Sequence, residues 1–573
     1  MTRLQELGFT DFTGGLNVRE NRSFQIADNE SPQMMNMRAD NRLGIYTRRG
    51  VRRWNTDPVP ATTWDPRHGI EHDFSDDTHL VLITSDNTVF AAGNDAVFSD
   101  LTIPCNAFPH LASFGSWGDV IYTATGRNVV SIGGSPVRIN KDKSVTALLP
   151  LDGGTYNDDY TIPLGGVMPA ADLVEPHGGY LFCASMRDSV DDKGNPISPA
   201  DFPSRIRWSH PNSPEDWATL DLLDIEAGGG RITALKSFQD HLLICKTDSL
   251  WALYGYDSES WQLVKVSLSV GVPSPTAITR APFGVFFYSV SGDGAVYLYQ
   301  GGNPESVSDN IEEILQSLPT DRYVDLWMAW VDDRLFMSVP WIADWDPRGG
   351  SSAIDTSLLT FDPRVGNGAW ELHRPAKGNV GPIIHRSDSL LERSLVCLFG
   401  SDVDACLVQV NAVDGAYDLI DDIVTPLPFP TRYATNWKFG GSPDLRKHWH
   451  RPRFVLRNTR ENFTLLIEVY RDYNETEARR AFQVTLDGEG GYRWRDLGYD
   501  DPAGDGFDWE PTDPEGRGGI WQGRVKGGRL IRGKSFGIAR SVQVVFSTAP
   551  GAAGQEWGLD AVILKHIDRR FTT

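Results

Sequence analysis

The chain has 573 residues with 56 glycines, 35 prolines and only 8 methionines, a composition typical of turn-rich β-proteins with more than one domain. Its formal net charge of −22 argues against a protein that grips nucleic acid through a basic surface. No apolar run is long enough to cross a bilayer, so we expect a soluble chain without a membrane segment.

The N-terminal part, residues 1–44, is predicted to be an extended arm. A Gly14–Gly15 turn opens a polar run with almost no apolar periodicity, and a short basic strand follows at Ile45–Trp54. Because so polar a segment has little apolar surface to bury, we expect it to dock against other parts of an assembly without forming a core of its own.

Residues 45–425 contain short apolar strands in pairs, separated by turns of Gly, Asp, Asn and Ser. The pairs recur every ~40–65 residues, which is the scale of one propeller blade. We therefore predict an all-β fold whose body is a β-propeller of about six to eight blades, with an array of β-sandwiches as the alternative. The paired strands fall at His79–Ala91, Asp119–Ile132, His241–Tyr254, Gly284–Tyr299, 333–361 and Leu395–Val410. Helical spacing is clearest at Ser308–Leu318.

The composition changes at Pro426, Pro428 and Pro430, which mark a domain boundary. Strand-like runs follow, and residues 426–573 are predicted to form a C-terminal β-sandwich. These runs are Arg453–Leu456, Phe463–Tyr470, Arg479–Leu486, Ser541–Phe546 and Ala561–His566.

Charge is divided unevenly along the chain. Residues 430–573 carry a net charge of +4, so the preceding 429 residues carry −26. Basic residues interleaved with aromatic ones can bind phosphates and stack on bases, or can form a protein interface. We favour an interface with an acidic neighbour, such as the body of an adjacent subunit. The candidate interface residues are Arg432, Trp437, Lys438, Arg446, Lys447, Trp449, Arg451, Arg453, Arg529 and Arg532.

The motifs of common catalytic sites are missing from the sequence. There is no Walker loop, HExxH, GxSxG or GxGxxG, and the stretch at Ser291 fails the Asp-box pattern because Gly294 comes one position early. We therefore expect no catalytic residue, no cofactor and no metal ligand. The acidic loop Asp500–Glu515 could attract calcium, but it does not follow EF-hand order, and a solvated loop is the preferred interpretation. Cys183 and Cys245 lie in apolar runs and are predicted to be buried thiols.

Three segments follow one another in a recognisable order. They are SRIRWSHPNSPEDW at Ser204–Trp217, a glycine-rich strand at Ile225–Leu235 followed by the hairpin Asp240–Gly255, and FFYSVSGDGAVYLYQGG at Phe286–Gly302. Together with the GGL arm, this order resembles the tail nozzle, or packaged-DNA stabilisation, proteins of short-tailed bacteriophages. The chain departs from that family in lacking an obvious long insertion for a flexible tip loop.

The resemblance implies a structural virion protein that forms the nozzle ring of a short tail, usually of about six copies. It implies assembly in the host bacterial cytoplasm and contact with the tail adaptor or portal complex, and with tail fibres or spikes. Double-stranded DNA would be retained by the ring and later pass through it without sequence-specific binding. Because a basic wall would hold phosphates, we expect a mostly acidic or neutral lumen. The alternatives are a virion-associated, glycan-acting propeller enzyme and a monomeric binding propeller.

Overall fold

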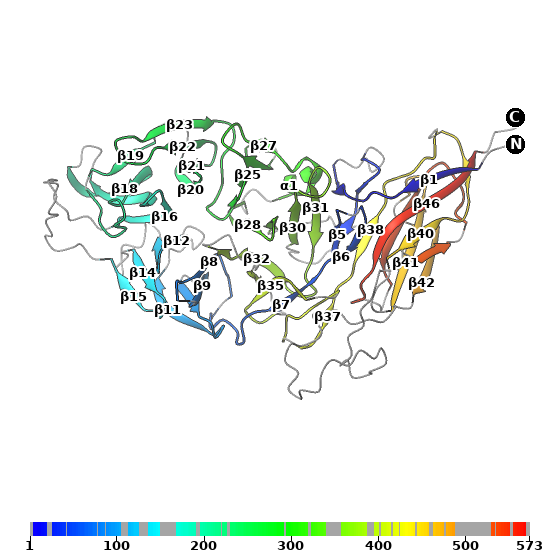
Figure 1. Ribbon diagram of the computed structural model, residues 1–573, viewed down its shortest axis with the longest axis horizontal. Coiled ribbons are helices and arrows are strands. Elements are labelled where there is room, and N and C mark those ends of the chain that lie inside the picture. Colours follow the sequence, from blue (N-terminus) through cyan, green and yellow to red (C-terminus); the bar gives the residue numbers. More distant parts are fainter. Residues whose placement is uncertain are drawn as a thin grey trace.

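The computed structural model in Figure 1 is an elongated, almost entirely β-stranded molecule, with a ring of small sheets at one end and a sandwich at the other. It describes residues 4–568, apart from 20–25, 105–112, 125–135, 149–167, 340–356, 387–394 and 487–528 and shorter gaps of one to four residues. The expected acidic loop at 500–515 lies outside the described residues, as does Cys105.

Seven antiparallel sheets of four strands make up the ring in the described residues, and we number them as blades 1 to 7. Blade 1 is β8 (His68–Asp73), β9 (His79–Ser85), β10 (Thr88–Ala92) and β11 (Phe98–Pro104). Blade 2 is β12 (Ser113–Trp117), β13 (Val120–Ala124), β14 (Val137–Asn140) and β15 (Val145–Ala147). Blade 3 is β16 (Ala170–His177), β17 (Tyr180–Val190), β18 (Pro196–Trp208) and β19 (Leu222–Asp224).

The next three blades follow the same order along the chain. Blade 4 is β20 (Ile232–Phe238), β21 (His241–Lys246), β22 (Leu250–Tyr254) and β23 (Gln262–Ser267). Blade 5 is β24 (Ile278–Ala281), β25 (Gly284–Ser289), β26 (Ala295–Tyr299) and β27 (Glu305–Ser306). The short helices η2 (Asp309–Ile311), α1 (Glu312–Gln316) and η3 (Tyr323–Asp325) lead into blade 6, which is β28 (Trp327–Val331), β29 (Arg334–Val339), β30 (Ser357–Asp362) and β31 (Ala369–His373).

Blade 7 closes the ring with strands from two distant parts of the chain. It contains β32 (Asn379–Ile383), β34 (Leu395–Phe399) and β35 (Cys406–Val413), and its fourth strand is β7 (Gly50–Arg53) from near the N-terminus. The short strand β33 (His385–Arg386) adds to blade 1 beside β8. The first strands of the seven blades contact one another in a closed circle, which confirms the predicted β-propeller. The predicted strand pairs are the middle strands of blades 1 and 4 to 7. In blade 2 only the first strand of the predicted pair Asp119–Ile132 is observed, as β13, and the second half of that range lies outside the described residues.

Two sheets form the sandwich (Figure 1). In the first, β46 (Gly558–Asp568) lies between β39 (Lys447–Trp449) and β40 (Arg453–Leu456) on one side and β1 (Gln5–Phe9) and β6 (Ile45–Thr47) on the other. The strands β43 (Arg529–Arg532), β44 (Gly537–Ala539) and β5 (Met37–Ala39) extend it. The second sheet is β38 (Arg432–Ala434), β45 (Val542–Thr548), β41 (Phe463–Arg471) and β42 (Arg480–Leu486). Their facing side chains, including Trp449, Phe454 and Phe546, are buried.

The N-terminal residues differ from the low-burial arm that the sequence predicts. Besides the strands in the sandwich, they form β2 (Gly15–Leu16), β3 (Glu30–Ser31) and β4 (Met34–Met35). Phe12, Leu16, Met34 and Met37 are at most 1% exposed and belong to the largest hydrophobic cluster. The prediction of little burial is wrong because a few apolar residues, spaced irregularly, each insert between elements that other parts of the chain supply.

The arm also joins the propeller to the sandwich. Met35 on β4 pairs with Leu372 of blade 6 on one side and with Arg432 of the second sandwich sheet on the other. One nine-stranded sheet therefore runs from blade 6 through β4 to β42. The paired strands β36 (Tyr417–Asp418) and β37 (Leu427–Pro428) lie at the same junction, where Asp418 accepts hydrogen bonds from Arg48.

Candidate functional site

The centre of the propeller is filled by side chains from the first strands of all seven blades and the segments beside them. The cavity that remains is about 40 Å³ and is lined by His68, Ile70, Ser113, Phe114, Leu173, Val174, Glu175, Leu235, Lys236, Pro275, Thr276, Ile278, Trp327, Met328 and Ile383. Such a space holds one or a few water molecules, whereas sites for small organic ligands span roughly 300–1,000 Å³. Among the described residues, the space left between these first strands is therefore too small for a drug-sized substrate or a DNA strand.

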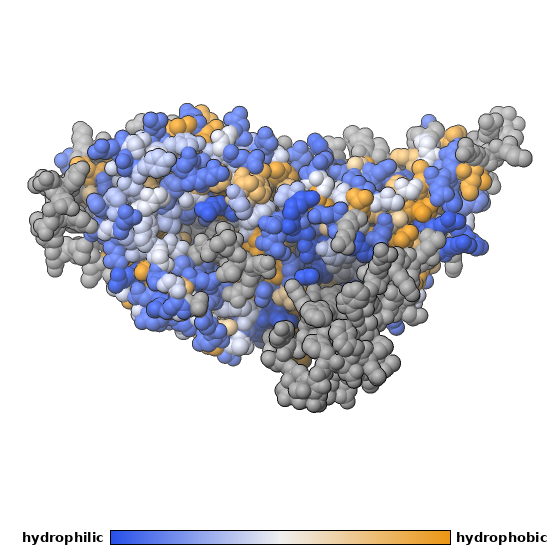
Figure 2. Space-filling view, in the orientation of Figure 1, coloured by the Kyte–Doolittle hydropathy of each residue, from blue (hydrophilic) through white to orange (hydrophobic). Residues whose placement is uncertain are grey.

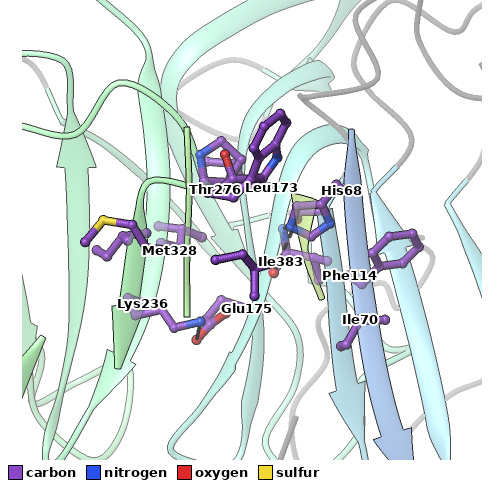
Figure 3. A pocket seen from close by; sticks show the side chains of 15 residues that line it. His68, Ile70, Phe114, Leu173, Glu175, Lys236, Thr276, Met328 and Ile383 are labelled. Carbon is purple, nitrogen blue, oxygen red and sulfur yellow. Dashed lines mark hydrogen bonds and ion pairs between the residues drawn. The ribbon is translucent and has the colours of Figure 1, made fainter. Parts of the chain in front are cut away.

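The charged groups of this cavity are paired with each other. Figure 3 shows Lys236 and Glu175 pointing toward one another, and their Nζ and Oε1 atoms are 3.7 Å apart. Glu175 Oε1 also accepts a hydrogen bond of 2.9 Å from the backbone N–H of Ser237. Both side chains of the ion pair are largely buried, so the pair ties blade 3 to blade 4.

His68 lies on the other side of the cavity, where its ring stacks on Phe114 with centroids 5.5 Å apart (Figure 3). Burial, helped by the positive charge of Lys236, lowers the pKa of His68 to about 4, so the imidazole is neutral at physiological pH. Among the described residues, none forms a hydrogen bond with its buried Nδ1 atom. The neutral His68 imidazole can therefore pack in the wall of this cavity and bind a water molecule inside it.

The arginines of blade 3 are more buried than the sequence suggests. Arg205 and Arg207 alternate with apolar residues as on a half-buried strand, yet their side chains are 0% and 5% exposed. Arg205 binds Asp224 through Nε at 2.8 Å, and both arginines bind Asp188 at 3.2 Å. Arg205 also lies 3.7 Å from the centre of the Phe202 ring. These carboxylates therefore neutralise buried guanidinium groups.

Four of the ten candidate interface residues are buried inside the chain, which corrects their prediction as contact residues. Trp449 belongs to the sandwich core, and its Nε1 donates to the carbonyl of Ala539. Trp437 is 1% exposed and packs against Tyr473. Lys447 is 0% exposed and its Nζ donates to the carbonyl of Leu445.

Lys438 is the fourth buried residue, and it holds the N-terminal segment in place. Its ammonium group forms an ion pair with Asp28 and lies 3.9 Å from the centre of the Phe9 ring. Burial lowers the pKa of Lys438 to about 8, although Asp28 acts in the opposite direction. A basic residue in a run of cations and aromatics can thus serve the fold, which the composition of the run does not reveal.

The other candidates lie at or near the surface. Arg446, Arg451 and Arg532 are exposed and Arg453 is partly exposed. Arg432 is mostly covered, because its Nε donates to Gln33 and its guanidinium lies 3.8 Å from Glu468. Arg529 lies on β43, and its side chain is outside the described residues. The structure therefore brings only part of the predicted set to one surface.

That surface is the outer face of the first sandwich sheet, which we call the cationic sheet face. Strand register places Arg453 directly opposite Arg532 on one side and Ile563 on the other, so these three side chains share a face. By the same register the face continues through Val455, Ile563, Lys565, Ile567, His448 and Ile538. Sequence alone could not define this face, because the strands that compose it lie up to about 110 residues apart.

Two kinds of site are absent from the described residues. No group of three or more His, Cys, Asp or Glu side chains there is placed to hold a metal ion. No helix in the same residues is long and apolar enough to span a membrane. Cys183 and Cys245 are fully buried free thiols, as predicted.

Comparison with known proteins gives likeness of fold only. No family model and no curated protein matches the chain. Among solved structures, it is similar to a catalytically inactive virginiamycin B lyase from Staphylococcus aureus, with 9% identity, a TM-score of 0.33, and coverage of 62% of this chain and 98% of the lyase. It is also similar to YCF48 bound to a D1 peptide, with 10% identity, a TM-score of 0.32, and coverage of 63% and 97%. The β-propeller domain of the Trilobed protease from Pyrococcus furiosus matches at 10% identity and a TM-score of 0.32, over 61% of this chain and 96% of that domain.

Proposed function

We propose that this protein is a structural virion protein, which forms the nozzle ring of a short phage tail, retains the packaged DNA and conducts it during ejection. The supporting observation is the position of the segments that resemble nozzle proteins. Ser204–Trp217 covers the end of β18 and the loop after it, Ile225–Gly255 covers β20 to β22, and Phe286–Gly302 covers most of β25 and β26. They occupy the adjacent blades 3, 4 and 5 in the order in which the resemblance has them.

The packed centre of the propeller bears on where DNA would travel. The cavity of about 40 Å³ that the described residues leave at the centre admits no nucleic acid, so we expect a conduit to be enclosed by several copies of the chain. The N-terminal 429 residues carry a net charge of −26, and a wall built from them would repel phosphates and let a duplex slide. The repulsion extends only about 8 Å at physiological salt, so it acts in a narrow lumen.

The joined architecture suits a wall that must resist the pressure of packaged DNA. The nine-stranded sheet is continuous in strand order from blade 6 through β4 into the sandwich. Buried ion pairs between distant segments, such as Arg48 with Asp418, add cross-links at the same junction. Relative motion of the two parts would break these contacts, so we expect each subunit to behave as one body.

Electron microscopy of the purified full chain tests the ring, and particles made without the protein test its role. We expect class averages with a closed ring and a central opening, and filled heads without the protein should lose their DNA to added nuclease. Particles that retain DNA without it would overturn the proposal. Release of sugars from host polysaccharide would favour the enzyme alternative, and a monomer at all concentrations would favour the binding propeller.

A further inference from the structure

The cationic sheet face carries closely spaced cations together with partly exposed aliphatic side chains. Arg453 and Arg532 occupy directly opposed positions on neighbouring strands, and like charges so placed destabilise a sheet. Arg451 precedes β40 beside them and is exposed, while Lys565 lies on the same face and pairs with Glu6 at 2.8 Å. Among the described residues, no ion pair within the chain is formed by Arg451 or Arg532. The face therefore has an excess of positive charge that an acidic partner would neutralise.

Aliphatic side chains run between these cations. Val455, Ile563 and Ile567 are partly exposed, and Ile538 at the edge of the sheet is 37% exposed. Figure 2 shows hydrophobic colour over the end of the molecule where Figure 1 places β40 and β46. Arginine is enriched at the centres of protein interfaces, and a contiguous exposed apolar patch, unlike single exposed aliphatic side chains, marks an interaction site.

A second surface on the same chain has the complementary composition. The outer edge of blade 4, which we define as residues 256–268, exposes 87% of Tyr256, 45% of Val264 and 56% of Leu268. The turn within it carries the exposed acids Asp257 and Glu259. Figure 2 shows hydrophobic atoms at the top of the view, above the blade that carries β23 in Figure 1.

We infer that the cationic sheet face of one copy binds the outer edge of blade 4 of a second copy. Both surfaces mix aliphatic residues with charge. The first has an excess of cations, whereas on the second the exposed acids Asp257 and Glu259 outnumber the exposed cation Lys265. They lie on different parts of an elongated chain (Figure 1), so the contact joins unlike patches head to tail. Contacts of this kind close into a ring when the rotation between copies permits and otherwise extend as a filament. The inference rests on the proposed ring and names the two surfaces that hold it together.

Charge reversal on each surface separately, followed by mixing, tests the contact. One variant carries Arg453→Glu with Arg532→Glu, and the other carries Asp257→Lys with Glu259→Lys. Matched controls are Arg52→Glu on β7 of blade 7 and Asp95→Lys in blade 1, both exposed and away from the two surfaces. Mass photometry and negative-stain images of the full chain give the size distribution, and circular dichroism with thermal melting checks folding.

We expect each reversed variant to lose assembly, with at least a tenfold rise in the dissociation constant, while the controls assemble like the wild type. An equimolar mixture of the two variants should recover assembly, because each then offers an acidic face or a basic edge to its neighbour. Assembly of the wild type should weaken between about 50 and 500 mM salt as the charges are screened. If a reversed variant does not fold, the milder pair Arg453→Gln and Arg532→Gln should show a reduced dependence on salt.

The outcomes separate this contact from the proposed function. A wild type that forms rings while both reversed variants do so equally well would overturn the contact and leave the nozzle proposal standing. Failure of two folded variants to recover assembly on mixing would also overturn it. A wild type that stays monomeric would overturn the contact and the ring together. Loss of binding to duplex DNA or anionic vesicles, without loss of assembly, would assign the cationic sheet face to a different partner.

Discussion

Arg48 and Asp418 form a bidentate ion pair, with Nη1–Oδ1 at 3.0 Å and Nη2–Oδ2 at 2.9 Å. Their side chains are 3% and 0% exposed. Arg48 also donates through Nε to Asn36 and lies 3.7 Å from the centre of the Phe429 ring. Asp418 accepts the backbone N–H groups of Val51 and Ala376, so one carboxylate joins the N-terminal segment, the end of blade 6 and the linker to the sandwich.

Removing either member of this pair should destabilise the whole protein. Arg48→Met leaves a buried carboxylate without its counter-ion, and Asp418→Asn leaves a buried guanidinium, each at a cost of about 3–5 kcal/mol. Urea unfolding followed by tryptophan fluorescence measures the loss. As a control, Lys141→Met removes an exposed ion pair with Asp76 and should change the midpoint little. Equal effects of the buried and exposed substitutions would contradict this account.

The closing strand of the propeller offers a second test. A Cβ atom at Gly50 would lie 1.8 Å from the carbonyl oxygen of Tyr417, so Gly50→Ala forces β7 away from its place in blade 7. We expect a loss of about 1–3 kcal/mol. Hydrogen exchange should be faster at Gln409 on β35, which pairs with β7.

Gly302 is the matched control for that substitution. A Cβ atom there would meet nothing within 4 Å, and its backbone is not left-handed, so Gly302→Ala should be neutral or slightly stabilising. Unchanged exchange on β35 in the Gly50→Ala protein would show that blade 7 does not depend on this close approach.

Most of the middle strands of the blades could be predicted from sequence, but the outer strands that pair with them could not. The stretch His241–Tyr254 is a visible hairpin because both its strands are apolar around a polar turn. The outer strand β23, by contrast, has no buried residue, so it lacks the continuous apolar run that marks the middle strands. The closure of blade 7 by β7 pairs residues more than 350 positions apart, and no local pattern specifies it.

Which of the candidate interface residues are exposed could be predicted only in part, for a similar reason. The basic and aromatic residues around Trp449 distinguish this segment from the rest of the chain, but composition does not say which side chains point inward. Lys447 and Trp449 face the core, while His448 between them lies on the cationic sheet face. Only the register with β46 and β44, which lie about 90–120 residues further along the chain, resolves this alternation.

The N-terminal segment should be required for a folded sandwich, contrary to the low-burial arm expected from sequence. Leu16 is 0% exposed within the largest hydrophobic cluster, so Leu16→Ala should cost about 2–5 kcal/mol. Leu4 is 47% exposed, and Leu4→Ala is the matched control, with little expected change. Deletion of residues 1–44 should give an aggregating or protease-sensitive chain, because it removes β1 to β5. A deletion variant that melts like the wild type would show that these contacts contribute little.

The last prediction concerns His68 and acid. Burial and the charge of Lys236 lower the pKa of His68 to about 4, whereas an unfolded chain has the ordinary value of 6.5. Between these values the unfolded state takes up a proton that the native state does not, so stability is fully present above pH 6.5 and is lost as pH falls toward 4. The difference of about 2.5 pKa units corresponds to a loss of about 3 kcal/mol once the pH has fallen to the native pKa.

Urea midpoints of the wild type and His68→Gln at pH 7, 6, 5 and 4.5 measure this contribution. We expect the urea midpoint of the wild type to fall more steeply with decreasing pH than that of the variant. The variant should therefore become more stable relative to the wild type as the pH falls. Burial and the neighbouring His241 also lower the pKa of His177 to about 4, so the single variant should keep part of the acid sensitivity and the double variant with His177→Gln should keep less. Selective ¹³C labelling of the imidazole Cε1 atoms reports the native titration directly. A His68 signal that titrates near pH 6.5 in the folded protein would contradict the closed centre of the propeller, and with it the argument that DNA must pass between subunits.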